Sequence, residues 1–220
     1  MFGYTFYWSL VWDAIPQLLQ GVRVTIEITI LSVGLGAMFA MPLAVARQNA
    51  KGALQLLAST WVEVARNTPT LFQVYMMYFG VGAIGFNMSS FAAVLIALTF
   101  NNAGYLAEIF RGGLAAVPVQ QLRAARSLGM TQWQAYRTVI FPQVFRHVIL
   151  PFTNQAVWAL LNSSLGMLVG LRELSGAANA AQSVSFRSFE FFIVTAGIYY
   201  VLAKATEFGL RMVFHRALRT

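Results

Sequence analysis

A run of 41 residues without Asp, Glu, Lys or Arg is the feature that most restricts what this chain can fold into. The run extends from Asn67 to Ala107. About 20 predominantly apolar residues are enough for a helix to cross the hydrocarbon core of a membrane, so the run is too long for one crossing. Turn-forming residues interrupt it: Gly80, Gly82, Gly85 and Asn87. The run therefore predicts the end of one membrane helix, a turn, and a second membrane helix.

The composition of the whole chain also indicates a membrane protein. Of its 220 residues, 58% are hydrophobic and 10% are charged, whereas a soluble domain carries about 25% charged residues. So few charged groups cannot cover a surface that faces water, and the abundance of Phe, Trp and Tyr excludes a disordered chain. The absence of cysteine excludes a disulfide, a thiolate metal site and a cysteine nucleophile.

Five apolar stretches predict an all-α, polytopic membrane protein that forms a single transmembrane domain over residues 1–220. They cover about 20–46, 54–79, 90–111, 147–171 and 189–213, with a polar segment at about 112–146 between the third and the fourth. The residues before Gln20 are rich in aromatic side chains, which predicts a segment at the membrane interface. We expect no cleaved signal peptide, because the N-terminus lacks a positive region and contains Asp13.

The positive residues between these spans predict the orientation of the chain. Ten fall on one side: Arg47, Lys51, Arg111, Arg123, Arg126, Arg137, Arg146, Arg211, Arg216 and Arg219. Three fall on the other side: Arg23, Arg172 and Arg187. Lys and Arg concentrate in cytoplasmic loops, so we expect the N-terminus outside and the C-terminus inside. The same asymmetry accounts for most of the formal charge of +8, and we therefore expect no nucleic-acid partner.

The polar segment 112–146 predicts a helix–turn–helix. Pro118 suits the first turn of a helix, and Gly129 can take the left-handed conformation that ends one. Thr131 and Gln134 have the spacing of a capping box for a second short helix, which we expect to end before Pro142. Apolar residues at helical spacing line one side of the first helix: Leu122, Ala125 and Leu128. These features leave two interpretations equally open, an amphipathic hairpin on the membrane and a docking element for a soluble partner.

The same segment resembles the EAA loop of bacterial ABC importer permeases. The usual form in that family is GQ-x-EAA-x-x-LG, followed further along the chain by a Pro-Gln pair. The matching residues here are Gln121, Ala124, Ala125, Leu128, Gly129, Pro142 and Gln143. The resemblance implies a cytoplasmic loop that couples the membrane subunit to an ATPase, and it places these residues in that loop: Gln121, Arg123, Ala124, Ala125, Gly129 and Pro142.

Other segments resemble the polar amino acid branch of these permeases. Residues Val62–Leu71 are similar to that branch's E-x-x-R-G-T-P-x-L segment, and residues Asn102–Gly113 are similar to its AY-x-AE-x-x-RGG segment. Residues Leu161–Leu165 lie where the branch often has KDTSL or KNSSL. The resemblance begins at about Gln20 and continues to the C-terminus.

The resemblance implies a type I ABC importer fold and a set of partners. It implies a core of two membrane subunits and an ABC ATPase dimer in a bacterial inner membrane, surrounded by lipid and supplied with an amino acid by an extracytoplasmic solute-binding protein. The chain has no GxxxxGK[ST] phosphate loop of its own. We therefore expect a subunit that is not an enzyme and binds no cofactor, with ATP and Mg held by the partner ATPase.

Three departures from the family pattern bear on these expectations. Arg123 stands where the loop usually has an acidic residue, Gln120 stands where Gly is usual, and Leu161 replaces a frequent Lys. If the chain paired with itself, both coupling loops would carry the charge reversal at Arg123. We therefore expect a second, non-identical permease subunit. The alternative is that Arg123 faces solvent or lipid headgroups, in which case its sign does not bear on pairing.

Charged residues in the spans occur at a spacing of three, which places both members on one helix face. This spacing predicts the ion pairs Glu63–Arg66, Glu108–Arg111 and Lys204–Glu207. An unpaired charge in the hydrocarbon core costs about 2.5–3.5 kcal/mol, so pairing is the simplest role for them. Pro69 follows Arg66 closely and exposes backbone groups, which leaves a functional role for the first pair equally open. His147 and His215 lie beside arginines, and we expect interfacial solvation there and no metal site.

Neutral polar side chains in the spans are candidates for the substrate pathway. They are Asn101, Asn102, Asn154, Asn162, Ser163 and Ser164. Amides and hydroxyls offer donors for a carboxylate and acceptors for an ammonium without placing a full charge in the pore. The same side chains can also bridge neighbouring helices, and the sequence leaves these two roles equally open.

The sequence favours one of three classes of function. An ATP-driven amino acid permease agrees best with the motifs, with acidic or amide amino acids (glutamate, aspartate or glutamine) preferred because the Asn162-Ser163-Ser164 cluster resembles those members. Arginine or histidine is the alternative substrate. An autonomous secondary transporter would show inverted repeats with broken helices, and no internal duplication is visible. An intramembrane enzyme is disfavoured because the spans contain no Ser/His/Asp set or HExxH motif.

Overall fold

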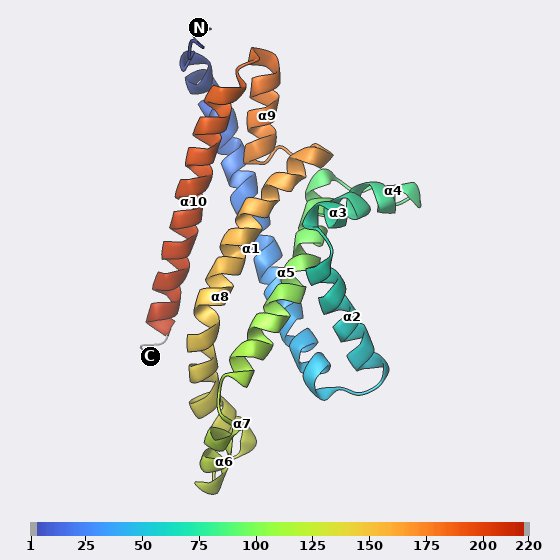
Figure 1. Cartoon of the computed structure of the whole chain (residues 1–220), viewed down its shortest axis with the longest axis vertical. Helices are drawn as coiled ribbons and strands as arrows, with labels where there is room; N and C mark the ends of the chain where they lie inside the picture. The colour runs from blue at the N-terminus through green and yellow to red at the C-terminus, as the bar shows by residue number, and fades with distance from the viewer. Residues whose placement is uncertain (1–3, 218–220) are drawn as a thin grey trace. The chain divides into compact units, whose positions relative to one another are not determined.

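A computed structural model describes residues 4–217, apart from the side chains of Asn49, Arg216 and Ala217. Arg219, which contributes to the predicted orientation, lies outside the described residues. The described chain is helical and contains no strand, in agreement with the predicted all-α class (Figure 1).

Ten α-helices make up most of the described chain. They are α1 (Ser9–Asn49), α2 (Ala53–Asn67), α3 (Thr70–Tyr75), α4 (Val81–Ala83), α5 (Ser90–Ala115), α6 (Val119–Ser127), α7 (Gln132–Ala135), α8 (Phe141–Asn162), α9 (Leu174–Ser185) and α10 (Ser188–Ala217). Two π-helical turns, Met76–Gly80 and Tyr136–Ile140, and a 3-10 helix, Ser163–Val169, connect some of them.

Among the described residues, three helices are long and apolar enough to cross a membrane: α1, α5 and α10. The first begins at Ser9, so much of the aromatic segment expected at the interface belongs to this helix. Its 41 residues correspond to roughly 60 Å. The second expected span is divided between α2 and α3, because Thr68 precedes a proline and adopts an extended backbone with ψ 141°. The count of five spans stays a prediction.

The chain falls into two compact units. The first comprises the described residues of Met1–Val33, Pro69–Thr99 and Trp158–Ala205, and the second those of Gly34–Thr68, Phe100–Val157 and Thr206–Thr220. Four helices contribute residues to both units: α1, α5, α8 and α10.

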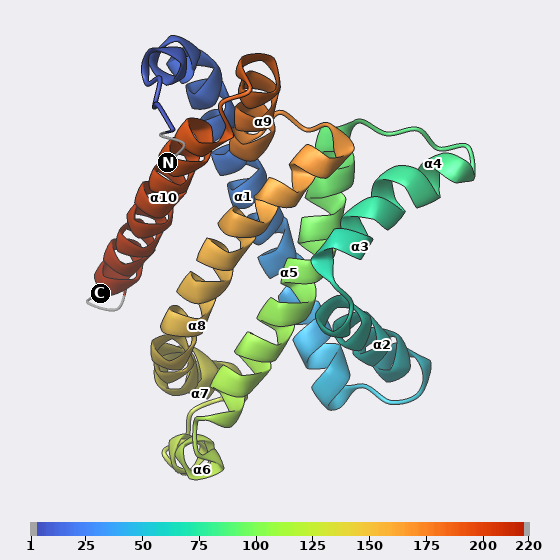
Figure 2. The ribbon, with the colours of Figure 1, turned by 45° about the horizontal axis from the view of Figure 1, so that its top comes forward.

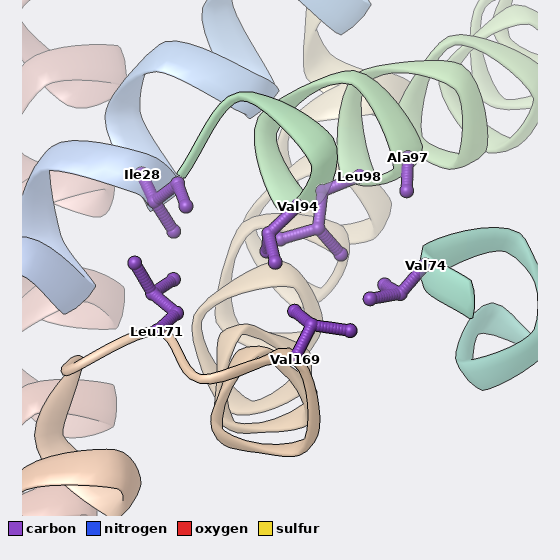
Figure 3. Packing of buried hydrophobic residues seen from close by; sticks show 7 residues of the cluster. All are labelled: Ile28, Val74, Val94, Ala97, Leu98, Val169 and Leu171. Atoms are coloured by element: carbon purple, nitrogen blue, oxygen red, sulfur yellow. The ribbon is translucent and has the colours of Figure 1, made fainter. Parts of the chain in front are cut away.

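The first unit has an aliphatic core. Buried side chains from α1, α3 and α5 meet those of the segment after α8 (Figure 3): Ile28, Val74, Val94, Ala97, Leu98, Val169 and Leu171. Beside this core, α9 lies against the N-terminal half of α1 (Figure 2). A Cβ added at Gly21 of α1 would lie 2.9 Å from the Leu174 Cα atom, so this approach requires glycine.

Small residues bring the helices of the second unit together. One buried cluster of this unit consists of Ala40, Ala44, Val62, Leu106 and Ala107. A Cβ added at Gly104 of α5 would lie 2.5 Å from the Ala65 Cβ atom of α2, so these two helices pack backbone to backbone. Such packing is typical of helices in membranes.

Candidate functional site

The segment between α5 and α8 forms the predicted helix–turn–helix, in the second unit (Figure 1). Pro118 directly precedes α6, and Gly129 takes the left-handed conformation with φ +82°. The Met130 N–H donates to the Ala125 carbonyl at 3.3 Å, which closes the end of α6 in the manner of a Schellman motif. The local geometry is therefore as the sequence predicts.

The capping box at the start of α7 is complete. The Gln134 N–H donates to Thr131 Oγ1 at 3.3 Å, and the Thr131 N–H donates to Gln134 Oε1 at 2.8 Å. The expectation that this second helix ends before Pro142 is wrong. It continues through a π-helical turn into α8, where the Phe141 N–H donates to the Tyr136 carbonyl. The wider turn accommodates Pro142, which has no N–H of its own to donate.

Two glutamines of the loop motif hold α6 against α8. The Gln143 Nε2 atom donates to Gln121 Oε1 at 2.7 Å and to the Val139 carbonyl at 2.8 Å. Ala125 is buried, whereas Leu128, which shares its helical spacing, is 80% exposed. Ala124 and Arg123 are also exposed. The loop thus presents an apolar side chain and a cation on its outer surface.

Five charged side chains from α1, α2 and α5 form a charge cluster in the second unit: Arg47, Glu63, Arg66, Glu108 and Arg111. Glu108 is its centre. One oxygen of that carboxylate lies 2.9 Å from Arg47 Nη1, and the other lies 2.8 Å from Arg111 Nη2 and 3.7 Å from Arg66 Nη1. Arg47 also pairs with Glu63.

The pairing within this charge cluster differs from the expected one. The Glu108–Arg111 pair is present, but Glu63 pairs with Arg47, and Arg66 pairs with Glu108. Because α2 lies close to α1 and α5, its charged side chains reach partners on those helices in place of one on the next turn. The sequence pattern assigns Arg47 only to the orientation of the chain and gives no sign of this role. In α10, Glu207 Oε1 lies 2.6 Å from Arg211 Nη2.

Five of the polar candidates for the substrate pathway form hydrogen bonds with other groups of the protein. In the second unit, Asn101 Nδ2 donates to the Ala65 carbonyl at 3.1 Å, and the buried Asn102 Oδ1 accepts from Gln155 Nε2 at 2.8 Å. Asn154 of the same unit is exposed. The candidates of the first unit donate to main-chain oxygens three or four residues earlier: Asn162, Ser163 and Ser164. Ser163 is buried, whereas Asn162 and Ser164 are half-buried. These bonds hold the side chains in place and leave the pathway role a proposal.

Two buried glutamates in the first unit were missed by the sequence. Glu173 caps α9 by accepting from the Ser175 and Gly176 N–H groups at 2.9 and 2.7 Å, and it accepts from the Tyr199 hydroxyl at 2.7 Å. Burial raises the pKa of Glu173, and these donors oppose that rise. Glu190 accepts from the Tyr4 hydroxyl at 2.5 Å and the Tyr7 N–H at 3.0 Å. The only local signal for either is a single acidic residue among apolar residues and close to an arginine.

Comparison with known proteins reveals the family. Residues 24–219 match the model of the binding-protein-dependent transport system inner membrane component family. The chain is 29% identical to the glutamine transport system permease protein GlnP of Escherichia coli (strain K12), over 96% of this chain and 97% of GlnP. It is 30% identical to the octopine transport system permease protein OccM of Rhizobium radiobacter, over 88% of this chain and 83% of OccM.

A solved structure agrees in fold. The chain superposes with a TM-score of 0.89 and 33% identity on a chain of an amino acid ABC transporter crystallised with histidines, covering 97% of this chain and 100% of that one. The permeases of this family are not catalytic, and their ATPase is a separate subunit. The chain belongs to the binding-protein-dependent transport system inner membrane component family and is a permease subunit of an ABC importer.

Proposed function

We propose that the chain is the membrane permease of an ATP-driven, binding-protein-dependent importer of acidic or amide amino acids, namely glutamate, aspartate or glutamine. The main support for an amino acid as the substrate is the 33% identity, over nearly the full chain, to a chain of the amino acid ABC transporter. The name of GlnP favours glutamine, whereas the name of OccM points to an amino acid derivative of another kind. Arginine or histidine is the alternative substrate.

The proposed pathway uses the neutral amides and hydroxyls. Asn101, Asn102 and Asn154 would contribute from the second unit, and Asn162, Ser163 and Ser164 from the first. Side chains whose donors are already held by main-chain oxygens keep acceptor capacity on the same groups. We expect them to accept from the ammonium group of a passing amino acid.

The proposed partners follow from the family. An ABC ATPase dimer holding ATP and Mg would dock on α6 and α7, and a solute-binding protein would deliver the amino acid outside. Exposed Leu128 supplies an apolar contact for the ATPase, and the Gln121–Gln143 bond would carry its movement into α8. Copurification tests directly whether the chain associates with an ATPase. An affinity-tagged chain expressed with its genomic neighbours is expected to retain an ATPase, and its isolation in transporting form without any ATPase would contradict the proposal.

We propose that the 220 residues act as one permease domain with five spans, the N-terminus outside and the C-terminus inside. Ser183 of α9 and Ser127 of α6 are both exposed, and the chain has no cysteine. Cysteines introduced singly at Ser183 and Ser127 should therefore react with a membrane-impermeant thiol reagent from opposite sides. Labelling is measured in intact cells and in inverted vesicles, with the cysteine-free chain as the control. Reaction of both positions from the same side would rule out this topology.

We also propose that the second membrane subunit is a different, related permease. Arg123 is exposed on α6, at a position where the loop usually offers a carboxylate to the ATPase. Pairing with a subunit that keeps the acidic residue would confine the charge reversal to one docking site. Native mass spectrometry of the intact complex should show one copy of this 24.3 kDa chain and one of another permease. Two copies of this chain and no second permease, in a complex that transports, would contradict the proposal.

A further inference from the structure

An apolar groove in the second unit lies between the end of α1 and the helix–turn–helix. Its volume is about 500 Å³, which is within the range of about 300–1,000 Å³ that small-molecule sites occupy. Residues of α1 and of the segment that follows α5 line it, among them Met41, Val45, Gln48, Val119, Trp133 and Tyr136. Among the described residues, none that lines this groove carries a charge.

The side chains of this groove are apolar, yet the protein leaves many of them uncovered. Met41 and Val45 lie one turn apart on α1 and are both exposed, and Trp133 of α7 is 66% exposed. The neighbouring Ala40 and Ala44 of α1 are buried in the second unit, so the helix packs with one face and presents another to the groove. A contiguous apolar surface left open in this way marks a site for another molecule or for the membrane.

The position of the groove along α1 identifies the membrane as the adjacent phase. The apolar stretch of α1 that is long enough to cross a membrane ends at Gln48, so Met41 and Val45 belong to its last two turns. Trp133 and Tyr136 have amphipathic rings of the kind that concentrate where a membrane meets water. An acyl chain that lies along α1 can therefore continue into the groove, with its headgroup at the level of Gln48.

The polar segment beside the groove carries only positive charge. The sequence contains no acidic residue between Glu108 and Glu173, whereas residues 112–146 contain Arg123, Arg126, Arg137 and Arg146. Arg137 directly follows Tyr136, is exposed, and forms no ion pair with any described residue. Arginine is common in cytoplasmic segments, so this charge alone does not imply a site. Beside an apolar groove at a membrane interface, it matches an anionic lipid.

We propose that the groove binds one anionic phospholipid of the cytoplasmic leaflet. One acyl chain lies between α1 and Trp133, and the phosphate lies near Arg137. The side-chain amides of Gln48 and Gln132, which line the same groove, donate to oxygens of the headgroup. The lipid thereby joins the span α1 to the helix–turn–helix. The inference goes beyond the transport function, and it rests on the proposed topology, which places residues 112–146 on the cytoplasmic side.

Photochemical crosslinking in the purified complex with its ATPase tests the site. The probe is phosphatidylglycerol with a diazirine in one acyl chain, added to the complex in detergent. We expect illumination to attach it to residues 41–48 and 132–141, as located by mass spectrometry of the peptides. Unlabelled phosphatidylglycerol should compete about fivefold more effectively than phosphatidylcholine, which is the effect of one basic side chain near an anionic lipid.

Variants of one arginine test recognition of the headgroup. Arg137→Gln should remove the preference for phosphatidylglycerol over phosphatidylcholine, and Arg137→Lys, which keeps the charge, should retain it. Arg146 belongs to the same polar segment and is also exposed, but neither it nor its neighbours in the sequence line the groove. Arg146→Gln is therefore the matched control and should keep the preference.

A larger side chain in the groove tests occupation by the acyl chain. Val119 lines the groove and is 53% exposed, so Val119→Trp should fill part of the space and reduce crosslinking to residues 132–141. Val213 of α10 is 63% exposed and does not line the groove, so Val213→Trp should leave this crosslinking unchanged. The yield of intact complex shows whether each variant assembles, and if Val119→Trp does not, the Arg137 variants decide.

The outcomes separate this inference from the proposed function. Equal competition by the two lipids, in a complex that still imports an amino acid with ATP, would overturn the lipid site and leave the permease function intact. An undiminished preference in Arg137→Gln would overturn it as well. Crosslinks to residues 132–141 that appear only after removal of the ATPase would show that the ATPase covers the groove, which also overturns the site. Failure of the unaltered complex to import any amino acid would contradict the proposed function itself.

Discussion

Replacing Gly129 with valine is expected to abolish ATP-driven uptake while the protein still inserts into the membrane. Gly129 has φ +82°, a conformation that a β-branched side chain tolerates poorly. An added Cβ there meets nothing within 4 Å, so the effect comes from the backbone and not from a clash. Forcing a branched residue into this conformation costs about 1–3 kcal/mol, and we expect the turn to rearrange and the α6–α7 docking surface to be lost.

The matched control for this variant is Gly129→Asn, because asparagine adopts the left-handed conformation more readily than valine. Uptake and substrate-stimulated ATPase activity are measured in both variants after reconstitution. We expect Gly129→Asn to retain most of the coupled activity. Full coupled activity in Gly129→Val would show that this turn is not part of a coupling element.

Replacing Glu108 is expected to have the largest effect on stability. Its carboxylate contacts three arginines and its side chain is only 16% exposed, so Glu108→Gln leaves three cations close together without their common anion. Removing one partner from a buried ion pair costs about 3–5 kcal/mol of stability. Because Glu108 is partly exposed, we expect a loss of stability near the lower end of this range. The temperature of unfolding of the detergent-solubilised complex provides the measurement.

Glu63→Gln serves as the control for this prediction. Glu63 is 51% exposed and contacts one arginine of the charge cluster, and exposed ion pairs contribute about 0–1 kcal/mol. We expect the unfolding temperature of the Glu63→Gln complex to stay close to that of the unaltered complex. If Glu63→Gln destabilised the complex as much as Glu108→Gln, the central role of Glu108 in the charge cluster would be wrong.

The features that were predicted from the sequence depend on local interactions. The left-handed Gly129 and the Thr131–Gln134 capping box follow from residues close together in the chain, and both occur as expected. The error at Pro142 has a local cause as well. Proline ends an ordinary α-helix, but a π-helical turn before it satisfies the backbone differently, and no residue pattern distinguished these two solutions.

The features that were missed depend on contacts between distant segments. Glu63 was matched to its neighbour on the same helix, whereas Arg47 reaches it from α1. Glu190 is buried beneath residues at the other end of the sequence, where Tyr4 donates to it. Leu128 shares the helical spacing of the buried Ala125, but it is exposed because α6 ends there and the chain turns at Gly129. Spacing along one helix cannot reveal which other helix lies beside it.

We expect this chain to move an amino acid across a membrane with energy from a separate ATPase. The most direct test of this expectation is uptake of radiolabelled L-glutamine and L-glutamate into liposomes that contain the purified complex, with the solute-binding protein outside and ATP inside. We expect at least one of the two amino acids to accumulate. This accumulation should require both ATP and the binding protein, and it should stop when the ATPase is inactivated. Uptake that continues without ATP, driven by an ion gradient, would show that transport by this chain does not depend on a separate ATPase.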